Sequence, residues 1–589
     1  MKKMISILLA VILCFTACTT VFGDSSVPVT EKAVGDAAKT HEIKSAEFPF
    51  FYNTTDLGKK LKFYFLDGAD DLPYVEVNDW LVLLDEELIG SKYGISFTME
   101  TDGPAVTYTR HNENKYAYDN GIPMVIDFDK DTIEFQDYNL FTMRGGSSTI
   151  LDTVTIPVFN EAGEPTLLEK VDTGSFTRYS DTLVFPLSDY GIDLIWQDGL
   201  YLIPLQTLSD IFMPNTTMGC FFFNGQSVIL AQNVTLCSDI YYAAPTGERS
   251  DALTEYGYKE LCLMLDYFYG LKDTHEIDSF AQFFHDIGFE GVLKGPEVKQ
   301  ADGAIYRLIT DFLSDGHSSW HAFSYLTGSF EYAANDSTLN TIFTHLYRQK
   351  NAREKFYPNG IPGYEEVGNT AYITFDNYVM ALQPNDYYEM APEDYPEGDT
   401  IGLIIKAHAQ ITRENSPIEN VVLDMSANIG GDDNVSAFVV PWFLGEGTPG
   451  MVDNMTGARC ISTYRADVNL DRVFDEKDTI TDKNLFCLTS PASFSNGNYV
   501  PCAFKASGMV TLLGRTTGGG ACNVLPASTA WGTSFQISSN NCKSFFKNGA
   551  FYDIDRGAEP DFVLPRPEQY YDRAALTDYI NSICWNTTS

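Results

Sequence analysis

The segment "CLTSPASFSNGNYV", Cys487–Val500, joins a short apolar stretch to a helix-like stretch and places three serines at the junction. These serines are Ser490, Ser493 and Ser495. A hydroxyl at the start of a helix can cap the first turn, and it can also serve as a nucleophile that the helix dipole helps to ionise. For any single serine the cap is the plainer interpretation, and Ser495 fits it best. Ser493 is the candidate nucleophile.

A second junction of this kind lies in "NVVLDMSANIGGDDN", where a buried-type strand ends at Gly430 and Gly431 before a helix. Glycine leaves backbone N–H groups unobstructed by a Cβ, which is one way to build an oxyanion hole. Taken alone, the pair is better explained as a tight strand-to-helix turn. His317, in "SDGHSSWH", is expected in a loop, although a lone histidine is more often structural.

The segments around these junctions alternate between strand and helix patterns, which predicts an α/β core of βαβ units over residues 336–589. Residues 251–335 have the apolar spacing of helices and carry His317. Residues 46–245 consist of short strand-like runs between turn signals, which predicts a β-rich, α+β region without catalytic residues. Two segments there, "LPYVEVNDWLVLL" and "GLYLIPLQTLSDIF", share an outline and favour a duplicated module.

The first 23 residues have two lysines, an apolar stretch and then small residues, which predicts a secretion signal. The run "CFTAC" resembles a lipoprotein box and makes Cys18 the candidate for lipidation, with ordinary cleavage near Gly23 as the alternative. Residues 24–45 are polar and small, as in a linker. We therefore expect an exported protein that is either secreted or held on the outer face of the cell membrane by its lipid.

The charge balance limits the partners. Eighty acidic residues against 39 lysines and arginines give a net charge of −41. Such a charge disfavours nucleic acid as a partner, because phosphates repel an acidic surface. It also disfavours a basic docking surface for lipid, so we expect membrane contact only through the N-terminal anchor.

Four motifs, in this order, resemble peptidase family S41: "VVLDMSANIGG", "LTSPASFSNG", "LLGRTTGGGA" and "DRGAEPDFVLP". The resemblance covers residues 251 to 565 approximately. It implies a ClpP/crotonase-like fold, a serine-type peptidase that needs no cofactor for catalysis, and a peptide or protein substrate. The serine motif of the family implies Ser493 as the nucleophile.

Two departures from the family pattern bear on mechanism. The loop Thr517–Gly520 lacks the lysine of the Ser–Lys processing proteases, and no peptide-binding PDZ module fits between His317 and the core. The tricorn-like branch takes its base from a histidine in a context like "DGHSS", which implies His317 as general base. The resemblance also implies an acidic third residue, Asp555 with Asp553 and Glu559 as rivals, and an oxyanion hole near Gly430, Gly431 and Phe494.

The segment "DVNLDRVFDEKD" stands outside the peptidase pattern. Its oxygen-bearing residues have the spacing of a Ca²⁺ loop, although Arg472 occupies the position where glycine is expected. A solvated acidic loop is the equally weighted alternative. The ligands of a structural Ca²⁺ would be Asp467, Asn469, Asp471, the Val473 carbonyl, Asp475 and Asp478.

A different class of function also fits the sequence. The missing lysine, and Asn496 where the family has glutamate, favour a surface binding or scaffold protein that keeps the peptidase fold without turnover. The retained serine, His317 and the Gly-Gly turn favour the enzyme, which is the leading interpretation.

Overall fold

The computed structural model describes residues 40–90, 93–112, 121–143, 151–216, 218–328, 338–547 and 550–587. The predicted signal peptide with Cys18, and most of the predicted linker, lie outside these ranges. From Glu42 onwards the chain forms one compact unit.

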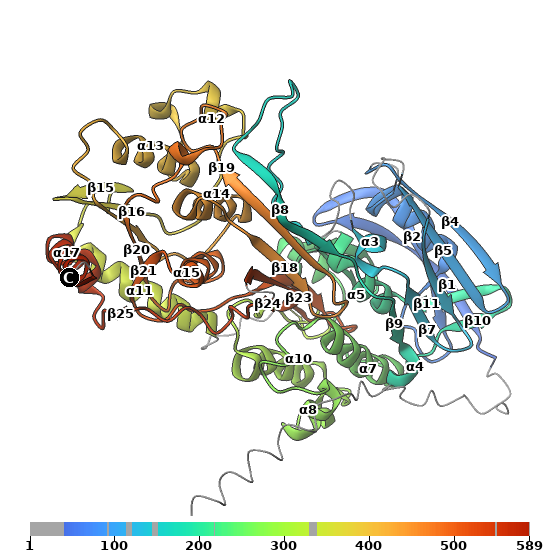
Figure 1. Cartoon of the computed structure of the whole chain (residues 1–589). Coiled ribbons are helices and arrows are strands. Elements are labelled where there is room, and N and C mark those ends of the chain that lie inside the picture. The colour runs from blue at the N-terminus through green and yellow to red at the C-terminus, as the bar shows by residue number, and fades with distance from the viewer. Residues whose placement is uncertain are drawn as a thin grey trace, which may run out of the picture. The chain divides into compact units, whose positions relative to one another are not determined.

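A six-stranded sheet forms the centre of the C-terminal half (Figure 1). Its strands run parallel except for the first edge strand. In sheet order they are β15 (Tyr364–Val367), β16 (Thr370–Thr374), β17 (Asn420–Asp424), β20 (Asn484–Thr489), β21 (Val510–Gly514) and β25 (Phe562–Val563). The α/β prediction for this half is confirmed.

Both faces of this sheet are covered, which explains why its central strands are continuous apolar runs. Val421 and Leu423 of β17 pack on one face with side chains from three helices, whereas Val422 packs on the other face with side chains from three more. The first group is α13 (Thr400–Ile411), α14 (Asp433–Leu444) and α15 (Asn496–Ser507), and the second is α11 (Thr338–Phe356), α16 (Glu568–Tyr571) and α17 (Arg573–Thr587).

The carboxyl ends of β17 and β20 place the two predicted junctions together. The strands are neighbours in parallel register, with Asp424 opposite Leu488. The loops that follow are therefore adjacent, and the Phe494 amide donates to the Asn428 carbonyl at 3.0 Å. This edge is where open α/β sheets bind their ligands.

A second sheet connects segments that are distant in sequence. Its long strand β23 (Ser534–Lys547) pairs directly with strands from the helical segment and from the core. Two further strands extend the sheet to the N-terminal region. These strands are β14 (Ser319–Ala322), β18 (Pro449–Asp453), β19 (Arg459–Ala466), β8 (Leu168–Arg178), β22 (Cys522–Ser528) and β24 (Ala550–Phe551). β8 thus carries part of the N-terminal region into a sheet that also contains strands of the C-terminal half.

The N-terminal region contains two further sheets, as the short strand-like runs predict. The two segments of similar outline become β3–α2 and β11–α5, and β3 pairs with β11 in one sheet. In sheet order the larger sheet is β10 (Ile195–Gln197), β11 (Leu200–Pro204), β3 (Tyr74–Glu76), β2 (Thr55–Leu66), β1 (Ile43–Tyr52), β13 (Val228–Ala231) and β12 (Cys220–Phe223), with helices α2 (Val77–Leu83) and α5 (Leu205–Thr216). The smaller sheet is β4 (Ile95–Asp102), β5 (Ala105–Asn112), β6 (Ile122–Asp127), β7 (Thr132–Phe135) and β9 (Leu183–Pro186).

The segment between these regions is helical, as its periodicity predicts. It comprises α7 (Asp251–Phe268), α8 (Phe280–Asp286), α9 (Glu290–Leu293), α10 (Val298–Arg307) and the π-helix Leu308–Leu313. His317 lies in the loop between this π-helix and β14.

Candidate active site

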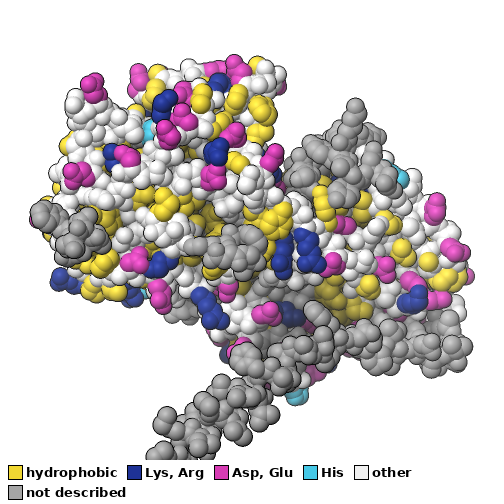
Figure 2. Space-filling view, in the orientation of Figure 1, with side chains coloured by type: hydrophobic (Ala, Val, Ile, Leu, Met, Phe, Trp, Pro, Cys, Tyr) yellow, Lys and Arg dark blue, Asp and Glu magenta, His cyan; other side chains and the backbone are white. Residues whose placement is uncertain are grey.

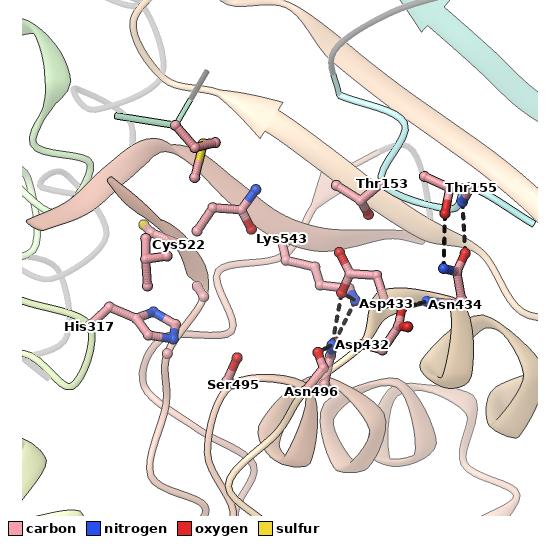
Figure 3. Close-up of a pocket in the computed structure, with 16 residues that line it drawn as sticks. Thr153, Thr155, His317, Asp432, Asp433, Asn434, Ser495, Asn496, Cys522 and Lys543 are labelled. Atoms are coloured by element: carbon pink, nitrogen blue, oxygen red, sulfur yellow. Dashed lines mark hydrogen bonds and ion pairs between the residues drawn. The ribbon is translucent and has the colours of Figure 1, made fainter. Parts of the chain in front are cut away.

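A cavity of about 540 Å³ lies at the carboxyl ends of β17 and β20 (Figure 3). Among its lining residues are His317, Gly431, Ser495, Asn496 and Lys543. Figure 3 shows the His317 imidazole and the Ser495 hydroxyl bordering the same open space, with Lys543, Asp433 and Asn496 bonded to one another on the other side of Ser495.

Ser495 occupies a strained turn. It precedes α15 with φ 56° and ψ −122°, a backbone conformation that costs energy for a residue with a Cβ, and its side chain forms no capping hydrogen bond. A serine held on a strained strand-to-helix turn is the arrangement that exposes a nucleophile in many hydrolases. Two glycines permit this turn: a Cβ on Gly430 would lie 2.7 Å from the Ser495 Cβ, and a Cβ on Gly520 would lie 3.0 Å from the Ser495 nitrogen. The cap expected at Ser495 is therefore absent.

Ser493, the expected nucleophile, does not reach the cavity. Its side chain is fully buried, its Oγ donates to the Met425 carbonyl at 2.7 Å and it accepts from the Ser490 amide at 2.9 Å. The hydroxyl thus ties the loop after β20 to the loop after β17. A buried hydroxyl with both functions satisfied has a structural role, and this corrects the placement of the nucleophile by the motif.

His317 is held beside Ser495 from two directions. β14 begins two residues later and pairs with β23, and the side-chain Nε2 of Gln536 donates to the His317 carbonyl at 2.7 Å. The imidazole packs edge-on against Phe494, the residue before Ser495, with 4.7 Å between ring centroids. Gly316 allows this approach, because a Cβ there would lie 2.3 Å from the Phe494 ring. The structure therefore places His317 on the same cavity as Ser495, whereas the family resemblance implies His317 as the base for Ser493.

The protonation state of His317 suits a base. Burial lowers the pKa of His317 below its ordinary value of 6.5, although the negative charges of Asp315 and Asp555 oppose that shift. The lowered pKa favours the neutral imidazole, which is the form that can accept a proton. Its Nδ1 is buried without a hydrogen-bond partner among the described residues.

Asp555 is the best placed of the three expected acids. One of its carboxylate oxygens accepts from the amides of Gly520 at 3.1 Å and Ala521 at 3.0 Å, in the loop behind Ser495. Asp553 is exposed and accepts from the Asp555 amide, and Glu559 is exposed as well. The carboxylates that act to raise the pKa of His317 are those of Asp315 and Asp555.

Asp315 was missed, although it stands two residues before His317. Its carboxylate accepts from the backbone amides of His317 and Ser318, at 3.1 and 2.7 Å, and from the hydroxyls of Ser318, Ser538 and Tyr269. It therefore shapes the loop that carries the imidazole. The "DG" before the histidine was the available signal.

The free amides at the cavity differ in part from those expected. The Gly430 amide donates to the Asn428 side chain at 2.9 Å and the Phe494 amide donates to the Asn428 carbonyl, so both are occupied. Among the described residues, the amides of Gly431 and Asn496 enter no backbone hydrogen bond, and both residues line the cavity. Of the three amides expected to form an oxyanion hole, only that of Gly431 is available at the cavity. The amide of Asn496 is available as well, although it was not expected.

The N-terminal region also lines the cavity, which the sequence did not indicate. Thr153, Thr155 and Met218 contribute to its wall. The amides of Thr155 and Ile156 donate to the Asn434 side chain at 2.7 and 3.1 Å, and Asn434 donates back to the Thr155 hydroxyl at 3.0 Å. This segment leads into β8, and the pairing of β8 with β19 holds the segment against the C-terminal half of the chain.

One disulfide borders the site. Cys522 in β22 is bonded to Cys542 in the adjacent strand β23, and Cys522 lines the cavity. The bond lies next to Lys543 in sequence and joins the strand after the Gly520 loop to the strand that pairs with β14.

The segment expected to bind Ca²⁺ is described from Asp467 to Asp478. Within the described ranges, no group of three or more His, Cys, Asp or Glu side chains is placed to share a metal ion. Backbone amides of the loop take up the oxygens instead: Asp478 accepts from Val468, Asn469 and Asp475, while Asp471 accepts from Val473. Calcium binding here stays a prediction, which a melting curve with EDTA and with Ca²⁺ would test.

The visible surface agrees with the charge balance. Acidic side chains are scattered over the described part of the face in Figure 2, and lysines and arginines form only small groups there. Among the described helices, none combines the length and apolar character needed to cross a bilayer.

Part of the chain matches the model of a known protein family. Residues 397–564 match Peptidase family S41, a span that contains Gly431, Ser495 and Asp555. A search of curated proteins found no match.

Several solved structures share parts of the architecture at low identity. The photosystem II D1 C-terminal processing protease is 19 % identical with a TM-score of 0.24 over 34 % of this chain and 43 % of its own. A putative peptidase from Parabacteroides merdae is 13 % identical with a TM-score of 0.38, covering 53 % and 89 %. The tricorn protease is 11 % identical with a TM-score of 0.32, covering 92 % and 67 %.

At such TM-scores these likenesses carry no argument about activity, and the first of them is matched over less than half of its length. The family match does not depend on these structures, because it comes from the sequence of residues 397–564. The part of the chain that matches a known family is therefore residues 397–564, and that family is Peptidase family S41.

Proposed function

We propose that this protein is an exported serine endopeptidase in which Ser495 is the nucleophile and His317 is the general base. The observation that carries the proposal is the strained, uncapped Ser495 in one cavity with the His317 imidazole. The family match over the surrounding residues supports the same reaction class.

The reaction would follow the general course of serine peptidases. His317 takes the Ser495 hydroxyl proton while Oγ attacks the carbonyl carbon of the scissile peptide bond. The resulting oxyanion accepts hydrogen bonds from the amides of Gly431 and Asn496. The imidazolium then gives its proton to the leaving amine, and water, deprotonated by the same imidazole, releases the acyl group from Ser495.

Asp315 and Asp555 would support the imidazolium that forms during each half of the reaction. Both carboxylates act to raise the pKa of His317 against its burial. Asp555 also holds the Gly520–Ala521 loop behind the nucleophile. We assign Asp555 the role of the third residue.

A fluorophosphonate probe tests the assignment of the nucleophile directly. We expect covalent labelling of the wild-type protein and no labelling of Ser495→Ala. Ser493→Ala is the matched control, since it removes a hydroxyl two positions away, and it should still be labelled once its folding is verified by a melting curve. Loss of labelling only in a folded Ser493→Ala would return the nucleophile to Ser493.

Absence of labelling in folded wild-type protein would instead favour the second function, a surface scaffold with the peptidase fold. The observation that supports this alternative is Asn496, which stands where the family has glutamate.

Export and lipid anchoring rest on the N-terminal sequence. We expect the cell to attach lipid at Cys18, so that metabolic labelling with palmitate marks the wild-type protein and not Cys18→Ser. Unlabelled protein recovered from the medium would instead indicate ordinary cleavage.

A further inference from the structure

The residue after the nucleophile, Asn496, is held by a buried polar network that the reaction as described does not use. Its Nδ2 donates to the Gly431 carbonyl at 2.6 Å and to the Asp433 carboxylate at 2.8 Å, and its Oδ1 accepts from the Lys543 ammonium at 2.5 Å. Asn496 is only 3 % exposed. The side chain therefore connects directly to the other residue that offers an amide to the oxyanion.

Lys543 determines which way the Asn496 amide points. An ammonium group can only donate, so the atom facing it must be Oδ1, and Nδ2 then faces the carbonyl and the carboxylate. The flipped amide would place Oδ1 against two acceptors and Nδ2 against a cation. The network thus permits one orientation, with Nδ2 directed to Gly431.

Lys543 itself is fully engaged and does not replace the missing dyad lysine. Its ammonium donates to Asp433, to the Ser436 hydroxyl at 3.1 Å and to Asn496, and it lies 4.3 Å from the centre of the Tyr499 ring. Burial alone would raise the pKa of Asp433, but the Lys543 charge and hydrogen bond lower it below its ordinary value. The two form a buried ion pair with side-chain exposures of 7 % and 22 %.

We propose that Lys543 and Asn496 are positioning residues that fix the two oxyanion amides, Gly431 and Asn496, relative to Ser495. The backbone amide of Asn496 is itself one donor, and its side chain holds the Gly431 carbonyl, which lies in the peptide that follows the other donor. Lys543 keeps that side chain in the productive orientation. The inference rests on the proposed function, because it concerns how the same site stabilises its oxyanion.

Preorganised donors stabilise developing charge only while their geometry holds, and a displacement of about 1 Å can cost about 100-fold in rate. Lys543→Met keeps the length of the side chain and removes the donors. We expect it to slow fluorophosphonate labelling of Ser495 by about 10- to 100-fold. Lys543→Arg, which keeps a charged donor, should recover part of the rate.

Lys543→Met alone would leave Asp433 buried without its partner and could unfold the protein, so the decisive variant is Lys543→Met with Asp433→Asn. This pair removes both charges and keeps an acceptor for the Asn496 Nδ2. We expect its melting temperature to recover toward wild type while its labelling rate stays about 10- to 100-fold low.

For a peptide ester substrate, the same double variant should lose kcat with little change in KM, since the donors act on the oxyanion and not on substrate binding. A folded double variant that labels at the wild-type rate would overturn the inference while leaving the proposed function intact. Unlabelled wild-type protein would instead contradict the proposed function, so the two failures are distinguishable.

Discussion

The two sides of Ser495 differ in how completely their polar atoms are paired. On the Asn496 side, the carboxylate of Asp433, the ammonium of Lys543 and the Asn496 amide all bond to one another. On the His317 side, the backbone is tightly held by Asp315 and Gln536, but the imidazole Nδ1 has no partner among the described residues.

This difference matches two different tasks in catalysis. Oxyanion donors work best when their geometry is fixed before the substrate arrives. A base must exchange protons with the nucleophile and with the leaving group, and its contacts often tighten only with substrate bound. We therefore interpret the paired side as the preorganised half of the site and the His317 side as the half that completes its contacts during the reaction.

Removing the base is the strongest way to break this comparison. We expect His317→Gln to lower kcat by about 10³-fold, the middle of the usual range for general acid–base catalysis, with little change in KM. Steady-state kinetics on a peptide ester measures both constants.

His321→Gln is the matched control, because His321 is also a histidine of low pKa, about 4, but does not line the cavity. It should stay within a few-fold of wild type. Equal losses in the two variants would remove His317 from the proton transfer.

The disulfide links the two sides, so breaking it should weaken both. The Cys522–Cys542 bond closes a loop of 20 residues. Cys522→Ser with Cys542→Ser should cost about 3 kcal/mol of unfolding free energy by the loop-entropy estimate, which denaturant titration measures. Activity should fall too, since Cys522 is part of the cavity wall.

Cys584→Ser controls for the loss of a thiol, because Cys584 is a half-buried cysteine of α17 that lies outside the disulfide. It should change the unfolding free energy by less than about 1 kcal/mol. Identical unfolding curves for the double variant and wild type would show that the strands need no covalent tie.

The charge of Asp555 offers a finer test of the His317 side. Its carboxylate helps to raise the pKa of His317, so Asp555→Asn should lower that pKa further. The base stays neutral at pH values above its pKa, so the acid limb of kcat/KM should move to lower pH. The Asn side chain keeps an oxygen for the Gly520 and Ala521 amides, which preserves the loop.

We also expect kcat at pH 7 to fall by about 10-fold in Asp555→Asn, because the imidazolium formed during the reaction loses a stabilising charge. An acid limb that stays in place or moves to higher pH would contradict the role assigned to Asp555.

Much of this architecture is readable in the sequence because it is local. The apolar strands "VVL" and "LFCL", each followed by glycine or serine before a helix, predict both the α/β core and the edge where the site lies. The "DGHSS" context singled out His317 through the family resemblance, and the structure places this residue on the cavity.

The choice between Ser493 and Ser495 could not be made in the same way. Both stand at one strand-to-helix junction, and only the left-handed φ of Ser495, with the Met425 carbonyl that captures Ser493, decides which hydroxyl enters the cavity. Both facts depend on the neighbouring loop, so the motif alone could not show which of the two hydroxyls lines the cavity.

Contacts between segments that are distant in sequence could not be predicted from the sequence, for a related reason. Lys543 reaches Asn496 because the sheet containing β23 packs beside α15, and Thr155 reaches Asn434 because β8 crosses to β19. No pattern within either segment encodes its partner. The disulfide has the same origin, since Cys522 and Cys542 meet only through the register of β22 on β23.

The smallest expected effect concerns the Thr155 contact at the outer wall of the paired side. Thr155→Val keeps the side-chain shape and removes the hydroxyl that accepts from Asn434, while both backbone amide bonds to Asn434 remain. Thr155 is exposed, so water can replace the lost partner and stability should change by less than about 1 kcal/mol. Because the residue lines the cavity at a distance from the reacting atoms, we expect KM to rise a few-fold with kcat unchanged. Thr155→Ser, which keeps the hydroxyl, should match wild type, and a fall in kcat without a change in KM would instead place this segment in the preorganised oxyanion machinery.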